Sequence, residues 1–334
     1  MASPRLIGIG SGLVAAVLFT SLANNSALAL MLFYLTPLPV LLAGIGWGLL
    51  AALIALVTAT LIVSFALGIQ TAIAFILYVG LPGVILSYLL LLHREAAPAG
   101  GPGGTVAAGG PAIEWYPLGR IIAWAAVMAG GLVALGLVLL GGDGEGYRAA
   151  VRSMFDDNAL TQLQGIFGAE FGQVEFDRFI ERFTRYILPA FAATFWLLVM
   201  IGNLWLAAKS ASISGQLNRP VPSFSQINYP PLFVAAFFAA LGLSFSPGGL
   251  GLAGMAFLGA FGCAFLILGV AVVHSLVAGT QLKPALLVIL YAGLLLTPWF
   301  APIVTALGLA EPFLHLRQRV QRPTPPAGGR GPNS

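Results

Sequence analysis

The sequence is poor in charged residues. Asp, Glu, Lys and Arg make up only 8% of its 334 residues, whereas they make up about 25% of a soluble globular domain. So few charges cannot cover a surface that faces water, and the mean hydropathy of +0.95 agrees. The shortage excludes a soluble enzyme, a nucleic-acid-binding protein and a secreted scaffold held by disulfides.

Groups that carry chemistry are also scarce. Cys263 is the single cysteine, which excludes an intramolecular disulfide and a cysteine metal site. The only lysines are Lys209 and Lys283, and there is neither a G-x-x-x-x-G-K-[ST] phosphate loop nor a His-Glu-x-x-His motif. We therefore expect a protein that is not an enzyme and that holds no metal and no cofactor.

Carboxylates are absent from the interior of every predicted span. Carriers coupled to protons or cations often place such groups near the membrane midplane, so coupling through a carboxylate is not expected. Asp143 lies in a predicted loop and has no second membrane aspartate to accompany it. This excludes an intramembrane aspartyl protease.

Long apolar runs are what the sequence does contain, and several reach the ~20 residues that cross a bilayer. They predict an all-α fold: a polytopic transmembrane helical bundle of 8–9 spans. The lipid bilayer is therefore the first partner. The predicted spans cover residues 6–22, 28–44, 46–67, 70–92, 118–140, 186–208, 230–246, 254–280 and 284–310.

The two signs of charge are separated along the chain. Eight of the eleven acidic residues lie between Asp143 and Glu181, while the chain outside 143–185 holds ten basic and three acidic residues. Because Lys and Arg are retained in cytoplasmic loops, Arg5 predicts a cytoplasmic N-terminus and the acidic window is predicted outside. The basic pI reflects this topology and not a nucleic-acid partner, since no basic run has interleaved aromatics.

The last apolar segment leaves two alternatives. A ninth crossing would put the Arg-rich tail outside, against the charge bias, whereas a hairpin interrupted at Pro298 and Pro302 would return it inside. The expected divisions are 1–92 for transmembrane helices 1–4, 93–117 for a flexible cytoplasmic Gly/Pro/Ala linker, 118–208 for transmembrane helices 5–6, 209–310 for the C-terminal transmembrane helices and 311–334 for a basic, partly disordered tail.

The insert 141–185 is the only sizeable extramembrane segment expected. Phe176, Phe179 and Phe183 recur at helical spacing, with charges on the opposite face. This pattern predicts amphipathic extracytoplasmic helices that lie on the outer interface. They form either a connector along the membrane or a lid over an outward-facing cavity.

Small and polar residues inside the spans suggest helix contacts. Gly8, Gly12 and Ala16 form a small-xxx-small ridge, which either packs within the bundle or docks a second membrane protein. Asn203 is expected to form an interhelical hydrogen bond or to contact a ligand. His274 is either a neutral interhelical hydrogen-bonding group or a proton switch, and it cannot activate the adjacent Ser275, because neighbouring helical residues point about 100° apart.

Uncharged polar groups are predicted to gather at the outer ends of the first four spans. Such groups, together with aromatic rings, suit a small neutral solute, although polar helix ends alone would explain them equally. The candidates at this mouth are Asn24, Asn25, Gln70 and Thr71, with Tyr34 and Tyr78 deeper in the spans.

Several segments together resemble the YybS-like family of bacterial membrane proteins of unknown function. They are the stretch 35–48 (LTPLPVLLAGIGWG), residues 203–209 (NLWLAAK), residues 269–274 (GVAVVH), and Pro298 with the Arg-rich end 316–319 (LRQR). The first six spans of that family are in turn similar to the substrate-binding S subunits of energy-coupling-factor transporters. This chain departs from those subunits in about 100 additional residues after span six and in having no recognisable vitamin-specific residue.

The resemblance implies a solute-binding transport component of the bacterial cytoplasmic (inner) membrane, without its own ATPase. It would dock on a membrane coupling subunit through Gly8, Gly12 and Ala16, and it would be driven by partner ATPases. The alternative is a membrane scaffold or regulatory protein without transport activity. Fold-level similarity does not decide between them.

Overall fold

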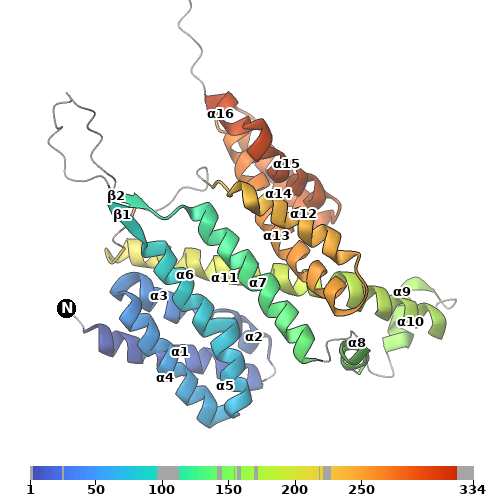
Figure 1. Cartoon of the computed structure of the whole chain (residues 1–334), viewed down its shortest axis with the longest axis horizontal. Coiled ribbons are helices and arrows are strands. Elements are labelled where there is room, and N and C mark those ends of the chain that lie inside the picture. Colours follow the sequence, from blue (N-terminus) through green and yellow to red (C-terminus); the bar gives the residue numbers. More distant parts are fainter. Residues whose placement is uncertain are drawn as a thin grey trace, which may run out of the picture.

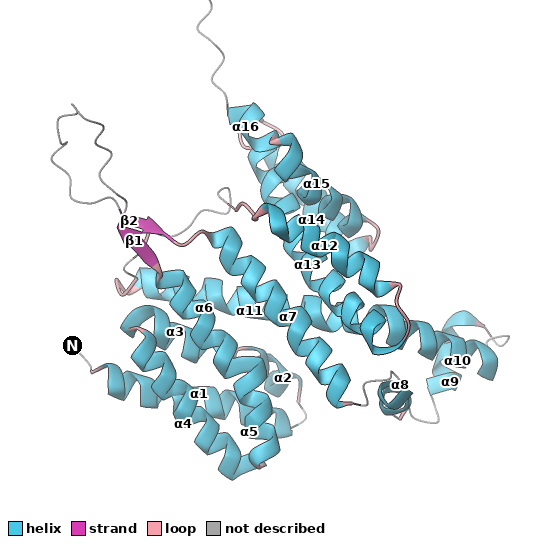
Figure 2. Ribbon diagram, in the orientation of Figure 1, coloured by secondary structure: helices cyan, strands magenta, loops and turns pink. Residues whose placement is uncertain are grey.

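The structure is a computed structural model of the chain. It describes residues 3–24, 26–95, 113–140, 145–153, 155, 159–168, 172–217, 219–220 and 227–321. Within these ranges the chain is almost entirely helical, with one two-stranded antiparallel pairing. Figures 1 and 2 show the helices running beside one another as a bundle, with the strand pair at one end.

Seven helical stretches of the described residues are long and apolar enough to cross a membrane, which confirms the expected polytopic helical bundle. The chain is therefore a multi-pass membrane protein. The stretches are Pro4–Ala23, Ala27–Trp47, Leu49–Leu67, Ile69–Leu91, Leu118–Leu139, Gln173–Ile213 and Gly248–Leu276.

The elements follow one another with few long connections. The first half contains α1 (Pro4–Thr20), η1 (Ser21–Asn24), α2 (Ala27–Tyr34), α3 (Pro37–Trp47), α4 (Leu49–Leu67), α5 (Ile69–Phe75), η2 (Ile76–Gly80), α6 (Leu81–Leu91), β1 (His93–Glu95), β2 (Ile113–Trp115) and α7 (Leu118–Leu139). The second half contains α8 (Glu145–Arg152), α9 (Ala159–Phe167), α10 (Gln173–Arg182), η3 (Phe183–Ile187), α11 (Leu188–Ile213), α12 (Pro231–Ser244), α13 (Gly248–Leu276), α14 (Lys283–Leu296), α15 (Phe300–Leu314) and α16 (Leu316–Gln321).

Two of the connections between neighbouring spans are single glycines. Gly48 and Gly68 have φ of 87° and 88° with extended ψ, a conformation that is essentially restricted to glycine. The chain therefore reverses direction between α3 and α4, and between α4 and α5, without any polar loop. The first four spans form the tight antiparallel bundle that their short loops predict.

The Gly8–Gly12–Ala16 ridge packs inside this bundle, against α4. A Cβ atom at Gly8 would lie 2.8 Å from the Ala51 carbonyl oxygen, and one at Gly12 would lie 2.6 Å from that of Ala55. Ala16 is fully buried in the same apolar cluster. This corrects the docking alternative for the ridge, because α4 already covers the surface that a partner would need.

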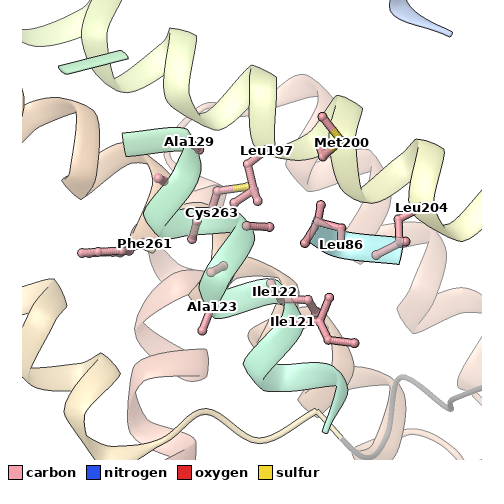
Figure 3. Close-up of a cluster of buried hydrophobic side chains, with 14 of the residues drawn as sticks. Leu86, Ile121, Ile122, Ala123, Ala129, Leu197, Met200, Leu204, Phe261 and Cys263 are labelled. Carbon is pink, nitrogen blue, oxygen red and sulfur yellow. The ribbon is translucent and has the colours of Figure 1, made fainter. Parts of the chain in front are cut away.

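The largest core lies where α7, α11 and α13 meet, with α6 and α12 at its edges. Figure 3 shows Leu197, Met200 and Leu204 of α11 together with Leu86 of α6 and the buried face of α7. Glycines allow the closest approaches, since a Cβ at Gly259 of α13 would meet the backbone of Ala190 in α11. Small residues thus hold these helices together, as expected where lipid supplies no hydrophobic drive for association.

The two ends of the bundle differ in chemistry. We call the end with β1 and β2 the hairpin end, and the end with α8, α9 and α10 the insert end (Figure 1). At the hairpin end His93 pairs with Trp115 across the two strands, and Arg94 forms an ion pair with Glu114 at 2.7 Å. The limits of the predicted 93–117 linker are therefore paired strands, while its part 96–112 lies outside the described residues.

The insert differs from the two interfacial helices that we expected. Tyr147 and Val151 of α8 bury their side chains against Leu137 and Leu252, so α8 covers the ends of α7 and α13. The helical stretch from α10 through α11 has 41 residues, or ~60 Å at ~1.5 Å per residue, about twice the bilayer core of ~30 Å. A helix of that length extends α10 beyond the membrane rather than along its surface.

The last apolar segment folds back. The chain breaks at Thr297–Trp299, between α14 and α15, and neither helix is longer than 15 residues. Because α12 is antiparallel to α13, with Phe233 against Phe265 and Ser244 against Gly254, α13 ends at the hairpin end, where α12 begins. Lys283 begins α14 shortly after the end of α13, and Arg317 donates hydrogen bonds to the segment 227–228 near the start of α12. The α14–α15 segment therefore enters and leaves at the hairpin end.

A buried ion pair holds the return of this segment in place. The Arg317 guanidinium Nε lies 2.8 Å from Glu311 Oε1, and the two side chains are 7% and 5% exposed. The Arg317 Nη2 also donates to the Ile227 carbonyl oxygen and to Asn228 Oδ1. Glu311 lies one residue beyond the predicted span 284–310 and was not among the predicted site residues.

Substitution of Gly12 is expected to destabilise the fold by overpacking the contact between α1 and α4. Gly12→Leu should lower the free energy of unfolding by ~1–3 kcal/mol or more, because the carbonyl oxygen of Ala55 cannot yield. Gly10→Leu is the matched control, since no atom lies within 4 Å of a Cβ built there. Melting temperatures of the purified variants measure the difference, and equal effects would contradict this packing.

Cysteine labelling should place the two limits of the folded-back segment on one side of the membrane. In a Cys263→Ser background, Glu95→Cys and Arg319→Cys should react with an impermeant reagent from the same side. Thr161→Cys in α9 should react from the opposite side, which the charge bias predicts to be the outside. If Arg319→Cys instead reacts from the same side as Thr161→Cys, the last apolar segment crosses the membrane once and does not fold back.

Removal of the Arg317 side chain should be strongly destabilising. Arg317→Met leaves Glu311 buried without its counter-ion, a change that typically costs about 3–5 kcal/mol. The double variant Glu311→Leu, Arg317→Met removes both charges and should recover most of the loss in melting temperature. A single variant as stable as the parent would show that the pair contributes little.

Candidate functional site

Two spans of the N-terminal bundle are interrupted by proline. The second span breaks between α2 and α3, just before Pro37, and the fourth changes to a π-helical turn, η2, just before Pro82. Proline has no backbone N–H, so each interruption leaves carbonyl groups without their helical donors. In a membrane such groups need another partner.

Asn203 supplies the partner at the first interruption. The Leu38 N–H donates to the Leu35 carbonyl oxygen instead of the Tyr34 carbonyl four residues back. Asn203 Nδ2 then donates to the Tyr34 carbonyl oxygen at 2.8 Å, and also to Val199 of its own helix. Asn203 is therefore an interhelical hydrogen-bonding residue, and its partner is the exposed backbone of an interrupted helix.

Trp196 supplies the partner at the second interruption. Pro82 has no N–H for the Tyr78 carbonyl oxygen four residues before it, and Trp196 Nε1–H donates to this oxygen at 2.9 Å. The Tyr78 hydroxyl donates to the Leu132 carbonyl oxygen of α7 at 3.0 Å. Tyr78 thus links its span to both α11 and α7. Tyr78 was among the predicted site residues, whereas Trp196 was not.

We call Tyr34, Tyr78, Trp196 and Asn203 the interruption site. Trp196 and Asn203 are seven residues apart on α11, two turns and ~10 Å on one helix face. One face of α11 therefore satisfies both interrupted spans, and it does so with neutral side chains. The spacing of seven was visible in the sequence, but nothing there identified the carbonyl groups that it serves.

Two polar groups of the interruption site have no hydrogen-bond partner in the described chain. Asn203 is only 4% exposed, and its Oδ1 makes no hydrogen bond with any of the described residues. The Tyr34 hydroxyl likewise has no hydrogen bond within the described part of the chain, although its ring stacks edge-on against Phe195 at 5.0 Å. A buried acceptor left unsatisfied costs about 1–3 kcal/mol, so it calls for an explanation.

Aromatic rings fill the region between the interruption site and the predicted mouth. The ring centroid of Phe19 in α1 lies 5.4 Å from that of Phe33 and 5.2 Å from that of Phe75. The ring centroids of Phe33 and Tyr34 are 5.7 Å apart. Phe75 is fully buried. These three phenylalanines were not among the predicted site residues, and their spacing along the sequence does not reveal that they meet.

Among the predicted mouth residues whose side chains the structure describes, no hydrogen bond joins Gln70 and Thr71. Gln70 is exposed, and the Thr71 hydroxyl donates to the Leu67 carbonyl oxygen within its own turn. Asn24 ends η1, and nothing is described of its side chain, while Asn25 lies outside the described residues. Of the predicted set, only Tyr34 and Tyr78 belong to the interruption site.

His274 forms an interhelical contact at the hairpin end. Its Nδ1 lies 3.0 Å from the Val270 carbonyl oxygen, and its Nε2 lies 3.2 Å from the Tyr291 hydroxyl of α14. A neutral ring that donates from Nδ1 and accepts at Nε2 satisfies both contacts. Ser275 instead donates to the Ala271 carbonyl oxygen, so the two adjacent residues do not pair.

The described residues contain no group of three or more His, Cys, Asp or Glu side chains that could hold a metal ion. The fold and the site together define a polytopic helical membrane protein with a neutral polar centre between its spans.

Comparison with known families agrees with this class. The chain belongs to the family described as "Predicted membrane protein (DUF2232)", whose family model matches residues 13–311. No curated protein matches the chain, and no solved structure matches it.

Proposed function

We propose that this protein is a non-enzymatic, solute-binding component of the bacterial cytoplasmic membrane, with the hairpin end in the cytoplasm. The observation that carries the proposal is the unpartnered Asn203 Oδ1, buried beside the interruption of the second span. Interrupted helices that expose backbone groups at membrane depth are a recurrent way to build a solute site in transporters.

The chemistry of the interruption site favours a small neutral solute. Its side chains are an amide, two phenols and an indole, and its free groups are an amide oxygen and a phenolic hydroxyl. A solute with a donor for Asn203 and an acceptor for Tyr34 would complete both. The neighbouring phenylalanine rings would contact an apolar part of the same molecule.

Transport of such a solute requires other subunits in this proposal. The sequence has no phosphate loop, so energy would come from ATPases through a membrane coupling subunit, as the resemblance to S subunits implies. Because α4 covers Gly8, Gly12 and Ala16, the coupling subunit would use another face of the bundle. The candidate is the exposed apolar face of α1 that carries Leu6, Leu13 and Val17.

A scaffold or regulatory role is the second candidate, and a different observation favours it. The helix α10 extends beyond the membrane and is tied to α8 by the ion pair between Arg152 and Asp177. Phe176 and Ile180 are buried within the insert, so the insert has a small apolar core of its own. Such a projection could hold a protein on the insert side without any transport.

Tyr34→Phe is the sharpest test of the solute site. The variant keeps the ring contacts and the backbone acceptor of Asn203, and it removes only a hydroxyl that has no partner in the described chain. The amount of small molecule that co-purifies with the full chain from native membranes should decrease by a few-fold to tenfold, as expected for the loss of one neutral hydrogen bond. Mass spectrometry of a solvent extract of the purified protein measures it.

Tyr88→Phe provides the matched control, because Tyr88 lies on α6 and is 47% exposed. The control should retain the small molecule, and both variants should melt at the parental temperature. If Tyr34→Phe retains it fully, or if the parent yields none above an unrelated membrane protein, the solute proposal fails and the scaffold role gains. Co-purification of an ATPase pair would support the transport role.

A further inference from the structure

Two cavities meet at the hairpin end. The first, of about 440 Å³, lies between the strand pair and the start of α7. The second, of about 250 Å³, lies further along α7 and against α12. Tyr116 and Arg120 line both cavities, so these two residues form the junction between them.

The first cavity has charged side chains in its lining, and one of their positive charges is uncompensated. Its charged lining residues are Arg94, Glu114 and Arg120, and Arg94 is neutralised by its ion pair with Glu114. The Arg120 guanidinium lies over the Tyr116 ring, 5.9 Å from its centroid, and it pairs with no carboxylate of the described residues. An anion at the junction would supply the missing counter-charge.

A second arginine lies nearby behind the strand pair. Arg219 is 9% exposed, donates to the Leu90 carbonyl oxygen, and lies over the Trp115 ring at 5.7 Å. Burial lowers the pKa of this guanidinium, which nevertheless stays protonated at neutral pH. It adds positive charge behind the wall of the first cavity.

The second cavity is an apolar groove that faces the bilayer. On α7 its lining residues follow helical spacing, and on α12 they include a strongly exposed leucine. Leu232 is 79% exposed and Trp124 is 52% exposed, so the groove is open on the lipid side. Its remaining lining residues are Ala123, Val127, Pro230, Phe233 and Ala236.

Aromatic side chains mark the depth of the junction. Trp124 Nε1–H donates to the Tyr116 hydroxyl at 3.2 Å, which leaves the Tyr116 proton available for an acceptor. Tryptophan and tyrosine are enriched at the level of lipid headgroups. Tyr116 and Arg120 also flank Leu118, where the membrane-spanning stretch begins. The junction therefore lies at headgroup depth, with the first cavity and its charged residues on the water side and the groove on the acyl side.

We propose that this junction binds an anionic phospholipid, with its phosphate at Arg120 and Tyr116 and one acyl chain in the groove between α7 and α12. The charge of Arg120 selects for a net negative headgroup, and the groove selects for a lipid over a free anion. Basic pockets between transmembrane helices bind anionic headgroups elsewhere by the same physics. The site is separate from the interruption site and does not depend on the proposed function.

Melting temperatures of the purified full-length protein test the proposal. Phosphatidylglycerol should raise the melting temperature by ~3–8 °C at saturation, and phosphatidylcholine with the same acyl chains should raise it by less than ~1 °C. Arg120→Gln should abolish the difference between the two lipids, whereas Arg120→Lys should retain part of it. Lys283→Gln is the control, because Lys283 is an exposed cation at the same end that lines neither cavity.

The groove has its own pair of variants. Ala236→Trp fills the groove and should reduce the phosphatidylglycerol shift, whereas Ala235→Trp, on the exposed face of α12, should leave it unchanged. The readout is the difference between the two lipids, so a general loss of stability does not mimic the effect.

Three results would overturn the proposal. They are an Arg120→Gln protein that keeps the full difference between the lipids, an equal shift with inorganic phosphate alone, and a groove variant that alters only the oligomeric mass. The second would indicate a site for a free anion, and the third would indicate that a second copy of the chain occupies the groove.

Discussion

The need to satisfy every backbone polar group within the membrane organises this protein. Pro37 and Pro82 interrupt two spans, and the carbonyl groups of Tyr34 and Tyr78 accept instead from Asn203 and Trp196 of α11. These two bonds join the N-terminal bundle to the α7–α11–α13 core, so they fix how the halves of the chain meet. A hydrocarbon environment offers no water as a substitute, which makes the register of α11 a condition for the whole fold.

The few charges of the chain follow a related constraint. Ionised groups are expensive in a low-dielectric interior unless they are paired and hydrogen-bonded. The buried pair of Glu311 and Arg317 lies at the hairpin end, with the backbone N–H of Leu316 and the 227–228 segment as further partners. It closes the folded-back α14–α15 segment, so one of the few buried charges in the described chain determines on which side the tail emerges.

The two proposed sites use the residual polarity in opposite ways. The interruption site is neutral, and in the proposed function it suits a molecule that exchanges hydrogen bonds without bringing charge. The junction at Arg120 is charged and open to lipid, and it suits a molecule that the bilayer itself supplies. A protein with so little charge can discriminate between these ligands because the unsatisfied groups differ: an amide oxygen and a phenolic hydroxyl at one site, and a guanidinium at the other.

The sequence by itself determined the class of protein, the positions of most spans and the break near Pro298, because apolar length and proline chemistry act locally. It also identified Tyr34, Tyr78 and Asn203 as polar residues inside spans. Only the tertiary structure decided that Asn203 and Trp196 serve the interrupted helices, that α4 covers the Gly8–Gly12–Ala16 ridge, and that α10 continues α11. These outcomes depend on which helix faces meet, and in a membrane nearly every face is apolar, so hydrophobic periodicity carries no information about pairing.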